Sequence, residues 1–398
     1  MATTPISYDS LKILLQYLEP NKRFQIAHRF PSIRTTERLV PLKINNLIFS
    51  KGGIQVDNTK YDICIQRRHT EGQTKTMLFE RRHEIDRFGL EDTSDGASLT
   101  PGDVLVEEYR PEFNGTPEII LRSMQEEVEH YESNSQMLVN PRAQKYRLEL
   151  FSLQCRRDNI DPPFERFMQL TIEDVVTEQK QTHRLVHNKK HSEAMKYLGE
   201  YLFGGRRTTI RVNNFCLSQD TCTLRLPVRI NFHMDCLDFF ATIRLAFDNM
   251  TPIIHESSFP LKRLKMVAWN ERDVTHPKVR EAERVLFRYS LIVDTFLAIP
   301  NLIVEYIASP ALFTLDYLNE VIENWVRTRK VIGTDFTINF KRKPDFFDEL
   351  EGVTNRFNGR MTGERTVIIP ITGASELYCE LSRGVQWTLR MVVKVAKQ

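Results

Sequence analysis

The chain has 398 residues, of which 41% are hydrophobic and 27% charged, and its formal net charge is +3. This composition is typical of a globular protein and excludes a disordered chain. The length predicts two or three structural units rather than one core. The small net charge disfavours nucleic acid as the main partner and gives no case for binding to a membrane surface.

Neither secretion nor membrane insertion is expected. The opening "ATTPISYDS" lacks the basic start and apolar core of a secretory signal. The most apolar long stretch, residues 285–309, contains Arg288, Asp294 and Glu305, which favours a buried core segment over a membrane span. The six cysteines form no CxxC pair, so we expect reduced thiols and a cytoplasmic or nuclear location.

The N-terminal residues predict a small helical module. Four leucines between residues 11 and 18 recur at i, i+3, i+4 and i+7, which is one face of a helix. Ser7 is a suitable N-cap, and Pro20 ends the run. Two more short helices bounded by prolines complete a module that we place at residues 1–41.

The pattern then changes to that of strands. Apolar residues alternate in "LKINNLIF" and "TKYDICIQ", so residues 42–115 are predicted to be rich in strands, with a flexible loop where Gly, Pro, Asp and Ser are frequent. Residues 116–140 predict an amphipathic helix. Its heptad pattern is short, so we expect it to pack on its own domain in preference to forming a coiled coil.

Residues 141–398 predict an α/β domain. The segments "YRLELFSLQC" (residues 146–155), "RFMQLTIEDVV" and "KQTHRLV" have the pattern of strands. A helix is expected in "HSEAMKYLGEYLFGG", with Ser192 as its N-cap.

From about residue 237 the pattern repeats loosely. "PLKRLKMV" has the L-x-x-L-x-L spacing of a leucine-rich strand. Thr314 caps a helix in which Leu318 and Trp325 are expected to be buried, and the last strand alternates strictly. The predicted fold class is therefore α+β: short N-terminal helices, a mixed strand/helix region with loosely repeated leucine-rich-like strand–helix units, and a C-terminal β meander. Stacked units are favoured over a Rossmann sheet.

No motif predicts catalysis. The chain lacks the glycine-rich phosphate loops, the G-x-S-x-G elbow and the H-E-x-x-H zinc motif, so we expect no catalytic residue, no cofactor and no enzyme. His183, His187 and His191 would align on a helix and could bind zinc. On a strand, His183 and His187 would lie about 13 Å apart, so no metal site is predicted. The basic cluster "FGGRRTTIR" is interpreted as a solvated loop in preference to a nucleic-acid site.

Residues 7–33, "SYDSLKILLQYLEPNKRFQIAHRFPSI", resemble an F-box, a module of three short helices that binds a Skp-type adaptor. "LLQYLEP" matches its centre, whereas "RFPSI" stands where the usual pattern has Val-Cys-x-x-Trp. An adaptor-binding face would leave apolar side chains exposed for the groove of a partner. The resemblance implies these adaptor contacts: Leu14, Leu15, Leu18, Pro20, Phe24 and Ile26.

A wider resemblance extends over essentially the whole chain. "FGLEDTSDGASLTPGDV", "NKKHSEAMKYL" and "VIENWVRTRKVIGT" are similar to a nematode-expanded group that is filed as F-box C or left uncharacterised. It implies an adaptor that recruits an unknown protein substrate to a cullin–RING ubiquitin ligase, with the C-terminal units presenting the substrate surface. The alternative is a non-enzymatic interaction or structural protein with a degenerate F-box, whose leucines pack on the strand domain.

Overall fold

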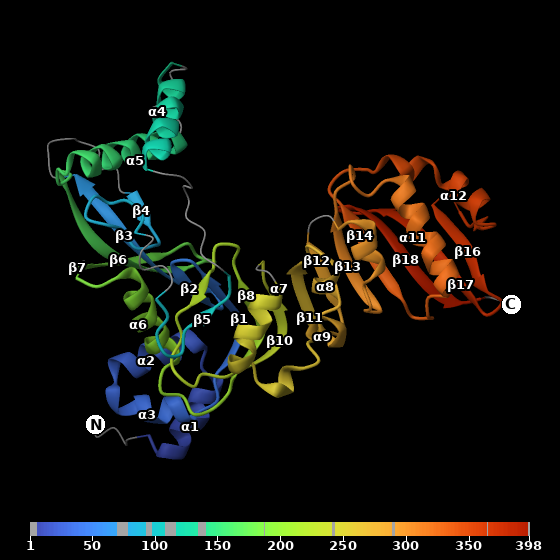
Figure 1. The fold of residues 1–398 in the computed structure, drawn as a ribbon. Helices are drawn as coiled ribbons and strands as arrows, with labels where there is room; N and C mark the ends of the chain where they lie inside the picture. Colours follow the sequence, from blue (N-terminus) through green and yellow to red (C-terminus); the bar gives the residue numbers. More distant parts are fainter. Residues whose placement is uncertain are drawn as a thin grey trace.

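The computed structural model is described for these residues: 6–69, 79–92, 98–107, 117–133, 141–186, 188–240, 243–288, 291–363 and 365–396. Short N-terminal helices lead into one large mixed sheet with helices packed against it (Figure 1), so the predicted α+β class is confirmed. No helix in these ranges is long and apolar enough to cross a bilayer. All six cysteines are free.

The N-terminal residues form the three predicted helices, α1 (Tyr8–Tyr17), α2 (Pro20–Arg29) and α3 (Pro31–Leu39). Ser7 caps α1 as predicted, because its Oγ accepts a hydrogen bond from the Ser10 amide at 3.2 Å. A proline opens both α2 and α3, and its missing N–H costs nothing at that position.

The centre of the sheet is a row of parallel strands in the spatial order β1-β8-β10-β11-β12-β13-β14. From β10 onward, neighbours in space are also neighbours in the chain, which is the order that stacked strand–helix units produce. The bounds are β1 (Lys43–Ser50), β8 (Ile210–Leu217), β10 (Phe232–Asp238), β11 (Arg263–Val267), β12 (Val285–Arg288), β13 (Ile303–Ala308) and β14 (Asp335–Phe340).

Helices cover one face of this parallel row. In β14, Phe336, Ile338 and Phe340 are buried beneath them, and the residues between point to the opposite face. α8 contacts α10 and α10 contacts α11, so the crossover helices share a side of the sheet. The helices of this face are α6 (His191–Phe203), α7 (Ile243–Met250), α8 (Glu271–Val274), α9 (Pro277–Glu281), α10 (Val293–Leu297) and α11 (Leu315–Thr328).

Antiparallel strands flank the parallel row at both ends. β1 continues into β2, β3, β6 and β7, with β4 paired to β3; β14 continues into β18, β17, β16 and β15, the predicted C-terminal meander, at the right of Figure 1. The bounds are β2 (Gly53–Val56), β3 (Thr59–His69), β4 (Phe79–Arg81), β6 (Phe164–Asp174), β7 (Lys180–Val186), β15 (Arg360–Met361), β16 (Thr366–Thr372), β17 (Ser375–Arg383) and β18 (Trp387–Val395).

The predicted strand at residues 146–155 is wrong, because this segment lies inside helix α5 (Pro141–Asp158). Leu148 and Leu150 alternate with Glu149 as in a strand, but both leucines are only half-buried, and the charged Glu149 is the residue that turns inward. Its carboxylate pairs with Arg81 and lies 3.7 Å from an Arg67 nitrogen, so a buried ion pair replaces the apolar contact that the alternation suggested.

The remaining elements complete the fold around this sheet. α5 packs on α4 (Pro117–Ser133), which lies within the expected 116–140 helix. α4 projects away from the sheet in Figure 1, whereas α5 is joined to β3 and β4 through Glu149. α6 begins at His191 with Lys190 as N-cap, so the expectation that Ser192 is the cap is also wrong. The other bounds are β5 (Val104–Leu105), β9 (Thr223–Leu224) and α12 (Leu350–Arg356).

The stability of the stacked units is expected to depend on Trp325. Its side chain is 1% exposed and meets the Phe336 ring edge-on at 4.9 Å, while Leu318 is fully buried, as predicted. Trp325→Ala should lower the free energy of unfolding by roughly 3–5 kcal/mol, measured by urea denaturation. Trp269, which is 68% exposed, is the matched control, and its replacement by alanine should cost less than about 0.5 kcal/mol. Equal effects of the two substitutions would contradict this packing.

Candidate functional site

The six residues expected to contact an adaptor differ in how far they are buried. Leu15, Pro20 and Phe24 are buried within the chain itself, Leu18 and Ile26 are half-buried, and Leu14 is 45% exposed. The three buried side chains hold the module together and are unable to touch a partner without unfolding it. Leu14, Leu18 and Ile26 remain available at or near the surface.

The outer face of α1 is apolar. Ile13, Leu14 and Tyr17 are 58%, 45% and 86% exposed, and their spacing places them within about 100° of one another around the helix. Leu15 points the opposite way and is fully buried, on the side where α1 contacts α3. Ile13 and Tyr17 were not predicted as contacts, because the leucine spacing indicates the side of the helix on which Leu15 packs inward.

Helix α2 is fixed to the sheet by contacts of two kinds. The Phe24 ring packs edge-on against Phe203 of α6, with ring centres 6.4 Å apart. The Asn21 amide nitrogen donates to the Val56 carbonyl at 2.9 Å, and the Tyr61 hydroxyl donates to the Asn21 amide oxygen at 3.0 Å. Since all these groups are buried, the module and the sheet share one core.

A buried ion network joins the helices to the rest of the chain. Glu37 of α3 lies between two arginines: Arg23 Nε donates to its Oε1 at 3.0 Å, and Arg206 Nη2 donates to both carboxylate oxygens at 2.7 and 2.8 Å. Arg23 also donates to the carbonyls of Pro41 and Val40 at 2.8 and 2.9 Å. Burial lowers the pKa of both arginines, and Glu37 opposes that shift. Buried charges persist only when paired in this way.

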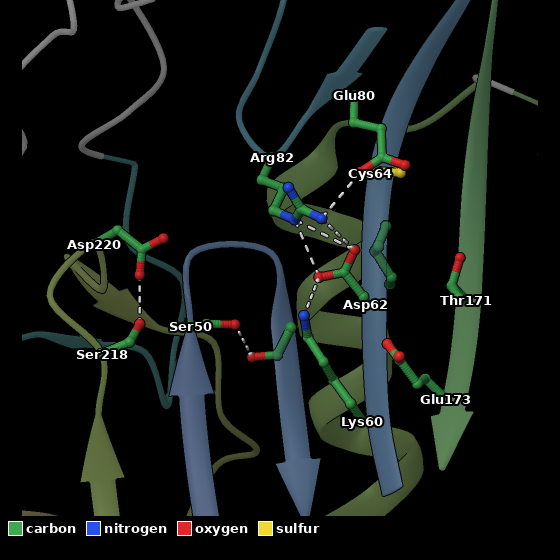
Figure 2. A network of polar contacts seen from close by, with 12 residues as sticks. Ser50, Lys60, Asp62, Cys64, Glu80, Arg82, Thr171, Glu173, Ser218 and Asp220 are labelled. Carbon is green, nitrogen blue, oxygen red and sulfur yellow. Dashed lines mark hydrogen bonds and ion pairs between the residues drawn. The ribbon is translucent and has the colours of Figure 1, made fainter. Parts of the chain in front are cut away.

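A small hollow of about 100 Å³ lies between the β1–β2 turn, the start of α6 and the loop after β8. Figure 2 shows Arg82 at its side, with the guanidinium directed at Asp62 and Glu80 and with Lys60 on the other side of Asp62. At the start of α6 the Glu84 carboxylate accepts the amides of His191 and Ser192 at 3.0 and 2.8 Å. The helix N-terminus is thus already neutralised by a side chain of the same chain.

The groups around this hollow are engaged in structural contacts. The Ser192 hydroxyl donates to Glu84 at 2.8 Å, and the His191 ring donates through Nε2 to the Ile63 carbonyl at 2.9 Å. Burial lowers the pKa of His83 to about 3, which leaves it neutral, and burial raises the pKa of the Cys222 thiol. A cysteine nucleophile needs a lowered pKa, and that of Cys222 is raised. The carboxylate beside the Ser192 hydroxyl, that of Glu84, already accepts hydrogen bonds from the amides at the start of α6.

The histidine series does not converge on one point. His183 is exposed on β7 and His191 is buried at the start of α6; His187 lies outside the described residues. Among the described residues no group of three or more His, Cys, Asp or Glu side chains could hold a metal ion.

The face of the parallel row opposite the helices carries a polar surface. Ion pairs cross from strand to strand: Arg288 to Asp238 at 2.7 Å, and Arg284, just before β12, to Glu305 at 3.2 Å. Farther along the row, the Asn213 amide donates to Asn45 at 3.0 Å. No crossover helix covers this side of the described sheet, so it is the broad surface that the strand–helix units present.

Comparison with known proteins finds a family match for only part of this chain. A family described as Domain of unknown function (DUF3557) matches residues 190–342, which run from α6 to β14 and exclude α1–α3. This match is consistent with the resemblance to an uncharacterised family. No curated protein and no solved structure matches the chain.

Loss of the Glu37 charge should destabilise the protein strongly. Glu37→Gln leaves Arg23 and Arg206 buried without a countercharge, so the free energy of unfolding should fall by roughly 3–5 kcal/mol. Denaturant unfolding followed by circular dichroism measures this loss. Asp335→Asn breaks a comparable but half-exposed pair with Arg390 and should cost less than about 1 kcal/mol. A Glu37→Gln protein as stable as the control would show that the network is not needed.

Acid should weaken the fold through His191. Burial lowers the pKa of this histidine in the folded protein, whereas the unfolded chain takes up a proton near pH 6.5. The free energy of unfolding should therefore fall as the pH drops below about 6.5, by up to about 1.4 kcal/mol per pH unit for one proton. His191→Gln keeps a donor for the Ile63 carbonyl and should reduce this slope, leaving the part due to His83. The exposed His183→Gln should not change it in a pH series of urea unfolding curves.

Proposed function

We propose that this chain is a non-enzymatic adaptor whose N-terminal helices dock a Skp-type protein and whose open sheet face binds a protein substrate for a cullin–RING ubiquitin ligase. The observation that carries the proposal is the exposed apolar face of α1, formed by Ile13, Leu14 and Tyr17. Exposed apolar side chains grouped on one helix are typical of a surface that a partner covers.

The anchoring of α2 and α3 supports this proposal. Because Arg23, Glu37 and Phe24 fix these two helices to the sheet, α1 is presented on a rigid base. A partner that binds a preorganised face loses less conformational entropy on binding. The resemblance of "LLQYLEP" to an F-box centre supports a Skp-type adaptor as the class of partner.

The alternative is an interaction or structural protein with a degenerate F-box. The burial of Leu15, Pro20 and Phe24 in the chain's own core favours it, since half of the expected contacts serve the fold. The residues "RFPSI" in place of the Val-Cys-x-x-Trp pattern favour it as well. Adaptor binding by the intact chain decides between the two functions.

The test uses two substitutions on the outer face of α1. Ile13→Asp/Tyr17→Asp places charge in the proposed interface without touching the buried Leu15, so the fold should survive. We expect the wild type to co-purify with a Skp-type adaptor and the variant to bind at least about tenfold more weakly, as for loss of central apolar contacts.

The matched control is Val331→Asp/Ile332→Asp. These two residues lie in the segment that follows α11, and they are 58% and 50% exposed. This variant should bind the adaptor as the wild type does. A wild type that fails to bind, or a control that loses binding equally, would reject the adaptor function and leave the degenerate F-box.

A further inference from the structure

A row of basic side chains crosses the start of three adjacent parallel strands on the open face. Lys43 of β1 is the direct neighbour of Arg211 of β8, and Arg211 is the direct neighbour of His233 of β10. They alternate with the buried Ile44, Val212 and Met234, so they point away from the helices. These three residues, hereafter the basic row, line a hollow of about 410 Å³ together with Asn45, Asn213, Asp235 and Lys262.

Lys43 and Arg211 of the basic row have no countercharge within the described part of the chain, because both are exposed and form no ion pair there. The one carboxylate lining the hollow, Asp235, lies 3.2 Å from Lys262 and 3.7 Å from the ring of His233, which also contacts the Ser257 hydroxyl at 2.9 Å. Like charges on directly opposed residues of neighbouring strands destabilise a sheet. Elsewhere on the same face the cations are matched, as in the Arg288–Asp238 and Arg390–Asp335 pairs. The basic row is therefore a local excess of positive charge at a concave place.

We propose that the basic row is a docking site for an acidic polypeptide segment in an extended conformation. Adjacent strands lie about 4.8 Å apart, so the row extends over roughly 10 Å. In an extended chain, side chains two residues apart point the same way about 7 Å apart, which lets two carboxylates reach both ends of the row. A single phosphate is too small for that span. Seven of the nine residues that line the hollow are polar or charged, whereas the pockets that small molecules prefer are mostly apolar.

The neighbouring amides fit the same ligand. Asn213 and Asn45 lie beside the cations and are joined by one hydrogen bond of 3.0 Å, which leaves further donors and acceptors to each side chain for a peptide backbone. The inference depends on the proposed function only for the identity of the ligand as a segment of a protein substrate.

The experiment measures binding of a short fluorescent peptide in which glutamate alternates with serine, using the full chain and fluorescence anisotropy. The neutral peptide has glutamine in place of glutamate. We expect the acidic peptide to bind more tightly and to weaken as salt rises. Lys43→Gln/Arg211→Gln should reduce its affinity by about three- to tenfold.

Lys341→Gln/Arg342→Gln removes the same charge from two exposed residues that follow β14, outside the hollow, and should leave the affinity within about twofold. Three outcomes would overturn the inference. The neutral peptide could bind as well as the acidic one, the control variant could lose as much affinity, or inorganic phosphate at a concentration equal to that of the peptide could displace it completely.

Adaptor binding separates this inference from the proposed function. Lys43→Gln/Arg211→Gln leaves α1 intact, so it should still co-purify with a Skp-type adaptor to the same extent as the wild type. A chain that binds the acidic peptide but no adaptor would retain the basic row and lose the adaptor function. A chain that binds the adaptor but not the acidic peptide would support the adaptor function and reject the basic row as a docking site.

Discussion

The hydrogen-bond ladder that runs from β7 through β1, β8 and β10–β14 to β15 is the constraint on which the rest of the described structure depends. Parallel neighbours need a crossover that returns to the same end of the sheet, so each of these connections must pass over a face. Here the crossovers share one face, and their apolar side chains bury Phe287, Tyr306 and Phe336. The other face is left open, and alternation along each strand makes it polar. One-sided coverage thus produces both the core and the surface.

The ends of this ladder are protected in different ways. A strand at an edge exposes unpaired backbone groups that could pair with another chain. β7, at one edge, is exposed along its whole length but carries Lys180 and Arg184, whose charges oppose such pairing. At the other edge β15 is only two residues long, Arg360 and Met361, and offers little ladder to extend. The antiparallel flanks therefore end the stack much as terminal caps do in repeat proteins.

Much of the secondary structure could be predicted because the local pattern and the tertiary environment agree. Thr314 caps α11, and Leu318 and Trp325 face the core, as the helical spacing indicated. The prediction failed for residues 146–155, where the partner of the inward side chain is a distant charge. Nothing local shows that Glu149 will meet Arg67 and Arg81, so the apolar alternation around it was misleading.

The exposed residues of the candidate site were hard to predict for the same reason, because burial depends on distant parts of the chain. A leucine pattern identifies the apolar side of α1 but not which apolar residues α3 will cover, and Leu15 and Tyr17 end on opposite sides.

The basic cluster of residues 203–211 shows why charge in a sequence is a poor guide to charge on a surface. Arg206 and Arg211 are close in the chain, but the fold gives them unrelated roles. Arg206 turns inward and neutralises Glu37, where it contributes to the joint between the helices and the sheet. Arg211 turns outward beside Lys43, a residue far away in the sequence, because parallel pairing of β1 with β8 places them in register. Neither the net charge of +3 nor the local sequence distinguishes the inward-facing Arg206 from the outward-facing Arg211. Strand register creates the local excess of charge, and only the folded chain reveals it.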